Sequence, residues 1–592
     1  MMSDPLPHLQ RVFGFPAFRG VQADVVARVL DHKRTLAVMP TGAGKSLCYQ
    51  LPSVMMAGTC VVVSPLIALM HDQLRAAEAV GIRAATLTSV DQNQAETRER
   101  FRTGALDLLY VAPERASNPS FRELLGQAPL SLFAIDEAHC VSEWGHDFRP
   151  DYRLLQPLMD AFAHVPRLAL TATADAHTRA DILKQLGIPD DGLIVSGFDR
   201  PNIRYAISPK ANTTQQIADV IRDHPGPGIV YAQTRAATEK LAEALARTGR
   251  PTRAYHAGLE PQVRARNQAD FVASEDMVMC ATVAFGMGID KPDVRFVAHA
   301  GLPKSIEAYY QETGRAGRDG DPSVAHLFWG ADDFALARRR IGEVDTERQP
   351  GERTRLAALG ALVETGGCRR RILLKHFGED RAEDCGNCDN CLGGSDAIDA
   401  TETARKVLSA VFRTGQLFGA GYVEQVLLGQ STDKSVARGH EALSVWGIVD
   451  GDEAALVKPV LRALALRDAL RANEHGGLEF GPAARALLKG EGTLSIVVPP
   501  KRERRRRASA GAVANPGDDP RNAPLFEALR VCRRDLAKEA GVPPYVIFHD
   551  SVLRDMAAKR PDSRQTLAML TGIGARKLEA YGDAFLAVIR GA

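Results

Sequence analysis

The sequence predicts an α/β protein in which two parallel-sheet lobes come first and helical modules follow. Across residues 25–330, short buried-strand runs alternate with helical stretches, which is the pattern of parallel sheets covered by helices. A polar stretch at 209–215 divides these units into two sets. Beyond about residue 336 strands become sparse and helical periodicity dominates. We therefore expect two stacked α/β lobes and then a different, mainly helical architecture.

The expected strands follow from short apolar runs bounded by turn residues. In the two lobes they include residues 35–39, 59–63, 107–111, 132–135, 167–170, 228–231 and 276–280. In the helical part, possible strands lie near 448–449, 478–480 and 493–498.

Length and composition indicate a multidomain globular protein. The chain has 592 residues, and a prior of about 150 residues per domain gives roughly three to five domains. Hydrophobic residues make up 45% and charged residues 25%, which excludes collagen-like, disordered and disulfide-scaffold compositions. The formal net charge is only +2, yet six of the seven residues at 501–507 are Lys or Arg. Any contact with a polyanion is therefore local.

Apolar runs and cysteines indicate an intracellular, cytoplasmic chain. Residues 1–13 hold no apolar run fit for a signal peptide, and the longest apolar stretch, near 60–70, is interrupted by Ser64 and Pro65. Nine cysteines are too sparse for a secreted scaffold. Four of them fall between positions 368 and 391, which in a reducing compartment indicates metal binding.

A phosphate-binding loop follows the first expected strand. It consists of Pro40, Thr41, Gly42, Ala43, Gly44, Lys45 and Ser46. A strand before it and a helix-like segment after it are the context that such a loop requires, and they weigh against an ordinary turn. The glycines let backbone amides face phosphates, Lys45 would reach the β and γ oxygens, and Ser46 would bind magnesium. Met39 stands where the longer form of the motif has glycine, and the shorter T-G-x-G-K-S form is typical of helicases.

Two adjacent carboxylates, Asp136 and Glu137, end the apolar strand at 132–135. Asp136 would hold the magnesium ion directly or through water, and Glu137 would polarise the attacking water as general base. An isolated Asp-Glu pair is more often a solvated strand end. The phosphate loop upstream favours the catalytic interpretation.

A pair of arginines in the second lobe could complete the nucleotide site. Arg315 and Arg318 stand three positions apart within residues 309–320, so they could face the same way across the cleft between the lobes. One or both would act as arginine fingers that stabilise charge on the γ-phosphate when the lobes close. Two ordinary surface arginines are the alternative.

Taken together, these motifs resemble those of superfamily 2 helicases, and further features narrow the resemblance to the RecQ family. The helicase motifs are the box at 136–139, the triplet at 171–173 and the element at 311–318. The features that resemble the opening motif of RecQ proteins are Leu9, Phe13, Gly14, Phe18, Arg19 and Gln22. In that motif the glutamine reads adenine, and an amide can bond adenine N6 and N7 together. The resemblance thus implies that Arg19 and Gln22 bind the nucleotide and that ATP is preferred over GTP.

Residues 140–150 resemble the aromatic-rich loop that, in RecQ proteins, couples single-stranded DNA to hydrolysis. The resemblance implies that Trp144 and Phe148 stack on bases and that Arg149 contacts phosphate. A partly buried aromatic turn is the alternative, because stacking residues also suit cores. Residues 281–291 resemble motif V of the family, which links both ligands in the second lobe.

Four cysteines form the pattern C-x16-C-x2-C-x2-C, and they are Cys368, Cys385, Cys388 and Cys391. Two-residue spacers let thiolates converge on one tetrahedral ion, and four sulfurs with no water indicate a closed structural zinc site. The other five cysteines, at positions 48, 60, 140, 280 and 532, are scattered. An iron–sulfur cluster remains the rival metal site.

The remaining modules are assigned by resemblance. Residues 401–500 resemble the winged helix of RecQ proteins, which binds duplex DNA, and a purely structural helical domain is the alternative. The segment from 501 to 522 is expected to be a basic, flexible linker that tethers DNA in a salt-sensitive way. Residues 525–589 resemble the helicase-and-RNase-D C-terminal (HRDC) domain, in which Arg576 and Lys577 are either DNA contacts or solvated helix residues.

The resemblance implies two RecA-like P-loop domains followed by a helical zinc-binding module, a winged helix and a small all-α HRDC domain. The implied domains are 1–207 (RecA-like, ATP-binding), 208–335 (RecA-like, helicase C-terminal), 336–400 (zinc-binding), 401–500 (winged helix), 501–522 (linker) and 523–592 (HRDC).

The implied activity is that of an ATP-dependent DNA helicase that moves 3′ to 5′ and unwinds duplexes, with ATP, Mg²⁺ and structural Zn²⁺ as cofactors. Its ligands would be single-stranded and duplex DNA. A single-stranded-DNA-binding protein and other repair proteins are candidate partners of a cytoplasmic, nucleoid-associated monomer, and repair, recombination and replication are its expected roles. Three alternatives remain: an RNA helicase, a translocase that leaves duplexes paired, and a non-enzymatic DNA-binding scaffold.

Overall fold

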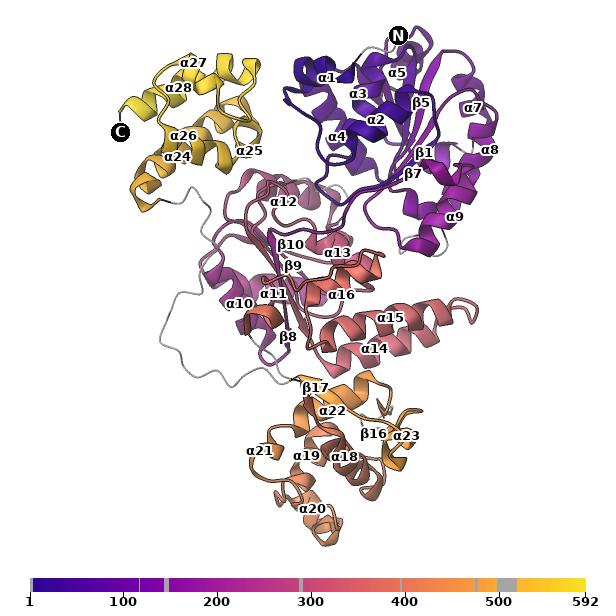
Figure 1. The fold of residues 1–592 in the computed structure, drawn as a ribbon, viewed down its shortest axis with the longest axis vertical. Helices are drawn as coiled ribbons and strands as arrows, with labels where there is room; N and C mark the ends of the chain where they lie inside the picture. The colour runs from indigo at the N-terminus through magenta and orange to yellow at the C-terminus, as the bar shows by residue number, and fades with distance from the viewer. Residues whose placement is uncertain are drawn as a thin grey trace.

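The chain forms two α/β lobes followed by helical domains, as the sequence predicts (Figure 1). The computed structural model describes residues 4–116, 118–142, 148–286, 291–393, 397–473, 477–497 and 519–591. In Figure 1 the second lobe occupies the middle, with the first lobe above it and the winged helix below. The C-terminal helical domain lies beside the first lobe, although more than 300 residues separate them in the sequence.

The first lobe is built on a seven-stranded sheet in the order β3-β4-β2-β5-β6-β1-β7, and all its pairings are parallel. Its strands are β1 (Thr35–Val38), β2 (Thr59–Val63), β3 (Ala84–Leu87), β4 (Leu108–Val111), β5 (Leu130–Ile135), β6 (Arg167–Thr171) and β7 (Leu193–Val195). Its main helices are α2 (Gln22–Leu30), α3 (Leu47–Met55), α4 (Ile67–Ala79), α5 (Gln94–Arg102), α7 (Pro119–Leu125), α8 (Leu155–Asp160) and α9 (Ala176–Leu186). The strands β1, β2 and β5 are buried along nearly their whole length because helices cover both faces of the sheet.

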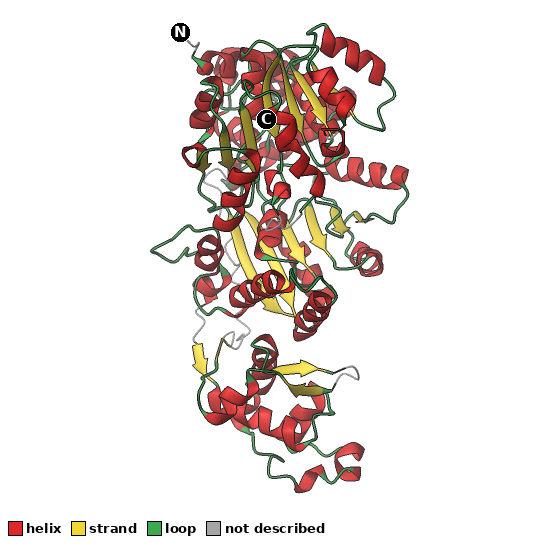
Figure 2. Cartoon of the chain, turned by 90° about the vertical axis from the view of Figure 1, so that its right-hand side faces the viewer, coloured by secondary structure: helices red, strands yellow, loops and turns green. Residues whose placement is uncertain are grey.

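The second lobe has a six-stranded parallel sheet in the order β10-β11-β9-β12-β13-β8. Its strands are β8 (Ile203–Pro209), β9 (Gly228–Tyr231), β10 (Thr252–Tyr255), β11 (Val278–Ala281), β12 (Phe296–His299) and β13 (Ser323–Trp329). Its helices are α10 (Thr213–Asp223), α11 (Arg235–Ala246), α12 (Pro261–Ala273) and α13 (Ile306–Thr313). Figure 2 shows the strands of both lobes as two groups flanked by helices.

Helical modules follow the second lobe. The zinc-binding module contains α14 (Ala331–Gly342), α15 (Gln349–Glu364), α16 (Arg369–His376) and α17 (Asp389–Gly393). The winged-helix domain contains α18 (Thr401–Arg413), α19 (Ala420–Leu427), α20 (Asp433–Ala437), α21 (Gly451–Ala454), α22 (Val457–Leu466), α23 (Ala484–Lys489), the hairpin of β15 (Leu470–Ala472) and β16 (Leu478–Phe480), and the pair β14 (Ala397–Asp399) and β17 (Ser495–Val497). The HRDC domain contains α24 (Ala523–Ala540), α25 (Pro544–Ile547), α26 (Asp550–Lys559), α27 (Arg564–Ala568) and α28 (Ala575–Arg590).

The hydrophobic cores separate these modules. A continuous cluster of buried side chains runs through both lobes and the zinc-binding module. The winged-helix domain and the HRDC domain each have a core of their own. The last two domains are therefore independent packing units, whereas the zinc-binding module shares the core of the motor.

Three details differ from the expectation. The possible strand near 448–449 is absent from the described residues: Val449 is buried in the winged-helix core, and its backbone N–H donates to the carbonyl oxygen of Leu427 on α19 instead of to a strand. The expected lobe boundary at 207/208 falls inside β8, which pairs with β13 along its whole length. The expected boundary at 400/401 comes just after β14. Because β14 pairs with β17 of the winged-helix domain, it belongs to that domain and not to the zinc-binding module. Sheet pairing, which single-sequence patterns do not reveal, explains both shifts.

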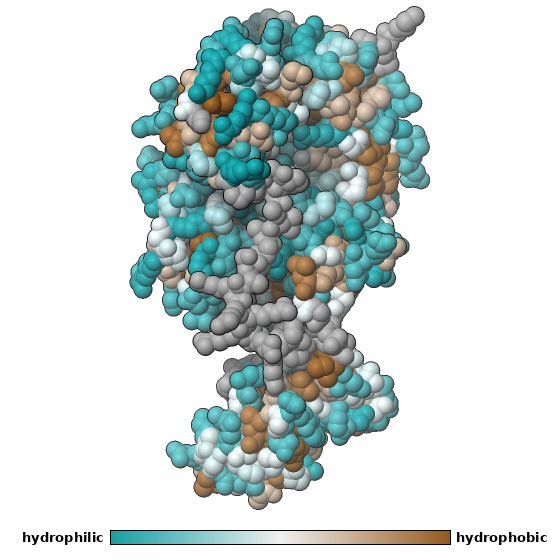
Figure 3. Space-filling view, turned by 60° about the vertical axis from the view of Figure 1, so that its left-hand side comes forward, coloured by the Kyte–Doolittle hydropathy of each residue, from teal (hydrophilic) through white to brown (hydrophobic). Residues whose placement is uncertain are grey.

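Hydrophilic side chains dominate the face of the molecule seen in Figure 3, and hydrophobic ones form small separate patches on it. No helix in the described part of the chain is both long and apolar enough to cross a lipid bilayer. The basic run at 501–507 lies outside the described residues.

Candidate functional site

The phosphate loop connects β1 to α3 at the carboxyl edge of the first sheet. Gly42 and Gly44 have φ values of 88° and 75°, in the left-handed region where a side chain would be strained. The Lys45 ammonium donates to the carbonyl oxygen of Met39 at 3.3 Å, so it folds back over the loop. The N-terminus of α3 follows at once and adds the positive end of its dipole. The loop is thus shaped to hold an anion.

The two predicted carboxylates lie at the same edge of the sheet. Asp136 follows β5, and the O–H of Tyr152 donates to its main-chain carbonyl at 3.0 Å. Loss of water around the Asp136 carboxylate raises its pKa to about 7, an effect that Glu137 reinforces and Lys45 opposes. The opposing effect of Lys45 places its positive charge near this carboxylate. Asp136 is therefore set to accept a cation beside the phosphate loop.

Glu137 is held in an unusual backbone conformation. Its φ of 48° lies in the left-handed region, which residues other than glycine rarely adopt. Its carboxylate lies 3.3 Å from Nδ1 of His139, and the same nitrogen lies 3.0 Å from the hydroxyl of Thr171 at the end of β6. Burial alone would lower the pKa of His139, but Cys140 and Glu137 outweigh it and raise the pKa to about 10. The imidazole of His139 thus joins the 136–139 box to the 171–173 triplet.

Gln22, predicted to read adenine, lies against the phosphate loop. Its side-chain N–H groups donate to the carbonyl oxygens of Ala43 at 2.9 Å and Gly44 at 3.3 Å. Its Oε1 accepts the backbone N–H of Arg19 at 2.9 Å. A Cβ added to Gly44 would lie only 2.5 Å from Nε2 of Gln22, so this position requires glycine for packing as well as for its φ.

The two candidate arginine fingers, Arg315 and Arg318, have different surroundings in the structure. A Cβ added to Gly42 would lie 3.3 Å from Cγ of Arg318, so the Arg318 stem lies on the phosphate loop of the other lobe. Arg315 is buried inside the second lobe, where its Nη2 would lie 3.3 Å from a Cβ added to Gly286. Because α13 ends at Thr313, both arginines lie in a turn and not on a helix, so their three-residue spacing does not by itself give them a common face. The close approach to Gly42 places the Arg318 stem at the cleft.

The predicted DNA-contact loop is described only in part. Trp144 lies outside the described residues. Phe148 lies between two guanidinium groups, 5.2 Å from Arg153 and 5.8 Å from Arg348. Arg149 donates to the carbonyl oxygen of Pro65 at 2.9 Å. The loop thus bonds to the 64–66 segment of the first lobe and reaches the zinc-binding module through Phe148.

The four predicted zinc ligands converge. The sulfur atoms of Cys368, Cys385, Cys388 and Cys391 all lie within 4.8 Å of one another. The distance is 3.9 Å from Cys385 to Cys391 and 3.3 Å from Cys388 to Cys391. Zinc–sulfur bonds of about 2.3 Å in a tetrahedron place sulfurs about 3.8 Å apart. The donor set therefore fits one structural zinc ion.

Asp389 connects this zinc knuckle to the motor. Its carboxylate accepts from the Arg369 guanidinium at 3.1 and 3.2 Å and from the backbone N–H of Ile207 at 2.9 Å. Because Ile207 belongs to β8, the knuckle is anchored on the sheet of the second lobe. The metal site thus supports the position of the whole module.

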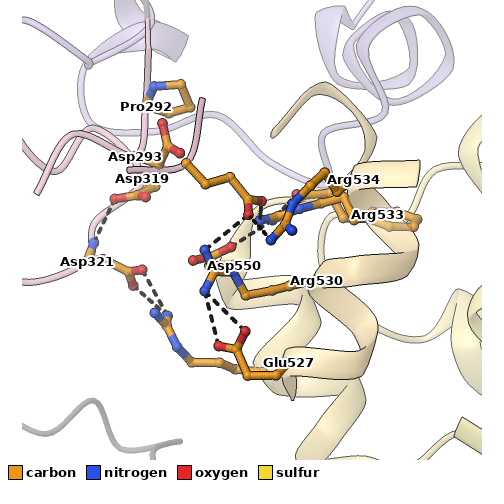
Figure 4. A network of polar contacts seen from close by, with 12 residues as sticks. Pro292, Asp293, Asp319, Asp321, Glu527, Arg530, Arg533, Arg534 and Asp550 are labelled. Atoms are coloured by element: carbon orange, nitrogen blue, oxygen red, sulfur yellow. Dashed lines mark hydrogen bonds and ion pairs between the residues drawn. The ribbon is translucent and has the colours of Figure 1, made fainter. Parts of the chain in front are cut away.

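The HRDC domain docks on the second lobe through charged groups (Figure 4). Glu275 lies between α12 and β11. Its carboxylate forms ion pairs with the guanidinium groups of Arg533, at 2.5 Å, and of Arg530 and Arg534, both at 3.1 Å. Arg554 forms two hydrogen bonds with Asp321, at 2.9 and 3.0 Å. Burial would raise the pKa of Glu275, but the arginines outweigh it and lower the pKa.

Further contacts extend this interface. Nζ of Lys291, at the end of the motif V segment, lies 5.5 Å from the ring centre of Tyr545 in α25. Arg576 donates to the carbonyl oxygen of Ala79 in the first lobe at 3.3 Å. Within the HRDC domain itself, Lys577 packs over the ring of Phe548, and burial lowers the pKa of its ammonium group. The sequence left Lys577 as a solvated residue or a DNA contact.

Tyr152 and Arg200, to which sequence reasoning assigned no role, also lie at the site. Tyr152 supports Asp136, and the guanidinium of Arg200 donates to the carbonyl oxygen of Thr41 at 3.0 Å. Their acceptors are main-chain carbonyls, which every residue carries, so no motif marks these contacts.

A parallel-sheet lobe with a phosphate loop, faced by an arginine from a second such lobe, defines the class of two-lobed nucleotide-driven helicase motors. Family models match along the chain, and they are DEAD/DEAH box helicase (19–182), Helicase conserved C-terminal domain (210–320), RecQ zinc-binding (331–392), RQC domain (394–505) and HRDC domain (522–589).

Curated relatives match over nearly the full length. The ATP-dependent DNA helicase RecQ of Haemophilus influenzae is 40% identical, with 98% of this chain and 95% of the relative covered. The protein of the same name from Bacillus subtilis is 38% identical, with 98% of each chain covered. The chain belongs to the RecQ family of ATP-dependent DNA helicases. The predicted fold class, enzyme class, ATP and DNA binding and structural zinc are thereby confirmed.

Proposed function

We propose that this DNA helicase hydrolyses one magnesium–ATP at the cleft between its lobes and converts the lobe movement into 3′ to 5′ travel on single-stranded DNA. The observation that carries the proposal is the stem of Arg318, which lies on Gly42 of the opposite lobe. A site that needs both lobes is complete only when they approach each other. Nucleotide turnover and lobe movement are then obligatorily linked.

In this proposal each polar group has one task. Lys45 and the amides of Gly42 and Gly44 bind the phosphates, while Ser46 and Asp136 hold Mg²⁺, which neutralises phosphate charge when bound. Glu137 accepts the proton of the attacking water, and His139 keeps its carboxylate in place. Arg318 stabilises the charge that develops on the transferred phosphoryl group, and Arg315 supports the motif V loop from inside the second lobe.

Nucleotide selection and DNA coupling use neighbouring residues. Gln22 and Arg19 bind adenine, for which Gln22 exchanges its bonds to the phosphate loop. Phe148 and Arg149 contact single-stranded DNA together with Trp144, and the bond from Arg149 to Pro65 transmits the strand's presence to the first lobe. The winged helix takes the duplex side. We further propose a monomer that acts at the nucleoid in repair, recombination and replication with a single-stranded-DNA-binding protein as partner.

The deciding experiment measures ATP hydrolysis with and without single-stranded DNA for wild type and Glu137→Gln. We expect strong stimulation by DNA that disappears in the variant, while ATP binding persists. Partial duplexes with a 3′ or a 5′ overhang then test polarity, and only the 3′ overhang should support unwinding. Equal ATP hydrolysis with and without DNA would contradict the coupling of hydrolysis to DNA. ATP turnover without strand separation would indicate a translocase and not a helicase.

A further inference from the structure

Arg200 lies in the segment that joins the two lobes, between β7 and β8, and bonds to both of them. From Nη1 it donates to the carbonyl oxygen of Thr41 in the phosphate loop at 3.0 Å. The same nitrogen donates to Gly314 of the second lobe at 3.1 Å. From Nη2 it donates to the carbonyl oxygens of Ala316 at 2.9 Å and Gly317 at 3.0 Å. One side chain thus spans the nucleotide cleft.

The chemistry of this contact suits a rigid connector. A guanidinium is planar, stays charged and presents its N–H donors in a fixed fork, so four carbonyl acceptors around it must keep a fixed arrangement. Hydrogen bonds from a charged donor are also stronger than neutral ones. A lysine would offer a point charge on a flexible stem and could not hold the same four oxygens.

The three acceptors in the second lobe belong to the turn that carries Arg318. The acceptor in the first lobe, Thr41, directly precedes Gly42, on which the Arg318 stem lies. The close approach continues at Gly314, where an added Cβ would lie 3.5 Å from Cβ of Thr41. The Arg200 contacts and the Arg318 contact are therefore neighbouring parts of one interface between the lobes.

Adjacent residues anchor the segment independently of Arg200. The Asp199 carboxylate accepts hydrogen bonds from the guanidinium groups of Arg370, at 3.1 Å, and Arg381, at 2.6 Å. Both arginines belong to the zinc-binding module. Asn202 donates to the carbonyl oxygen of Gly317 at 2.8 Å and so holds the turn to the second lobe. Loss of the Arg200 guanidinium would therefore leave the 196–202 segment and the 314–317 turn in place. It would remove the hydrogen bond from Arg200 to the Thr41 carbonyl in the phosphate loop.

We propose that Arg200 is a positioning residue, which sets Arg318 on the phosphate loop and so ties the spacing of the lobes to the competence of the nucleotide site. It touches no phosphate itself and acts through Thr41 and the 314–317 turn. The inference rests on the proposed role of Arg318 as arginine finger.

The test compares Arg200→Ala, Arg200→Lys, Arg318→Ala and the double variant Arg200→Ala/Arg318→Ala in the full-length protein. We expect both Arg200 variants to lower kcat of DNA-stimulated ATP hydrolysis by about 10- to 100-fold, because a misplaced finger costs transition-state stabilisation. The KM for ATP and the Kd for single-stranded DNA should change less than about threefold, because ground-state binding does not use the finger. The double variant should be no slower than Arg318→Ala alone.

Arg250→Ala is the matched control. The Arg250 guanidinium also donates to several carbonyl oxygens, those of Ile221, His224, Gly226 and Asp276, but all of them lie in the second lobe. Its loss should lower Tm without lowering kcat, which separates a positioning role from a structural one.

The outcomes distinguish the two proposals. If Arg318→Ala keeps wild-type turnover, the arginine-finger assignment fails, and the inference about Arg200 fails with it. If Arg318→Ala is inactive while Arg200→Ala turns over normally, only the inference about Arg200 is overturned. A rate loss in Arg200→Ala that multiplies the loss in Arg318→Ala, or one matched by Arg250→Ala at equal Tm, would also overturn it.

Discussion

Nδ1 of His139 lies 3.3 Å from the carboxylate of Glu137, two residues earlier in the same turn. The left-handed backbone of Glu137 and the Thr171 hydroxyl, which lies 3.0 Å from the same nitrogen, hold the ring beside the carboxylate. A carboxylate held beside the imidazole keeps one orientation. A fixed orientation is required of the group that takes a proton from water.

Substitution of His139 should therefore slow catalysis more than binding. We expect His139→Ala to lower kcat of ATP hydrolysis by about 10- to 100-fold with little change in nucleotide affinity, since the general base loses its fixed orientation. Steady-state hydrolysis and fluorescent-nucleotide titration measure the two quantities. His164→Ala, an exposed histidine of the same lobe, serves as control. A variant with unchanged kcat would show that Glu137 needs no such support.

Gln22 should govern which nucleotide is used. We expect Gln22→Ala to raise the KM for ATP by about tenfold or more while GTP hydrolysis stays as weak as before, because the paired hydrogen bonds to adenine are lost. Gln127→Ala, on the exposed surface of the same lobe, should leave both nucleotides unaffected. An equal loss for ATP and GTP would mean that Gln22 only supports the phosphate loop through Ala43 and Gly44.

Glu307 on α13 and His376 on α16 join the second lobe to the zinc-binding module over 2.6 Å. Burial would raise the pKa of Glu307, but His376 outweighs it and lowers the pKa to about 2, while the pKa of His376 is raised. The Glu307 contribution to stability is present above pH 4.5, its ordinary value, and is lost as pH falls toward 2. The His376 contribution is present below pH 6.5 and is lost as pH rises through the raised pKa.

It follows that this pair stabilises most between about pH 4.5 and 6.5. We expect Glu307→Gln to lower Tm by about 2 °C or more in that window, with a gap that narrows as pH rises above it. Thermal unfolding of wild type and variant across pH 5 to 9 measures the gap. A gap that widens with pH would contradict the assigned directions.

Loss of the metal should unfold the zinc-binding module and loosen the motor. We expect wild type to carry one zinc per chain and Cys388→Ser to carry far less, with a lower Tm and weaker DNA-stimulated hydrolysis, because metal binding and folding are coupled. Cys532→Ser, in the HRDC domain, should keep its zinc. Metal analysis by atomic absorption measures the zinc content, and iron with visible absorption would contradict the zinc assignment.

The docked position of the HRDC domain should depend on Glu275. Replacing it by lysine would leave Arg530, Arg533 and Arg534 facing a like charge, so we expect Glu275→Lys to release the domain and increase the radius of gyration in small-angle X-ray scattering. The control Glu243→Lys removes an exposed ion pair with Arg247 in the same lobe, and it should leave the radius of gyration unchanged. Added salt should move wild type toward the variant. Identical scattering at low salt would show that the domain stays docked without Glu275, through contacts such as that of Arg554 with Asp321.

Sequence reasoning found the parts whose chemistry is local. The residues from 40 to 46 carry their whole function within seven positions, and three of the four zinc ligands lie within seven more. The expected shared direction of Arg315 and Arg318 stays a prediction, because their spacing gives a common face only on a continuing helix and α13 ends at Thr313. Register and pairing also escaped prediction, since the neighbours of β8 and β14 lie more than 90 residues away.

Arg200 shows a second limit. Its acceptors are carbonyl oxygens of residues 41, 314, 316 and 317, and main-chain oxygens have no residue identity that a sequence could display. The docking of the HRDC domain is similar, because Glu275 and Arg533 are 258 positions apart and each looks like an ordinary surface charge.

The HRDC domain is joined covalently to the surface that it binds. Its effective concentration at Glu275 is therefore set by the length of the connecting chain and does not fall when the protein is diluted. A ligand that competed for the same arginines would have to overcome this constant local concentration, so the ligand concentration needed to displace the domain should be independent of the enzyme concentration in dilute solution.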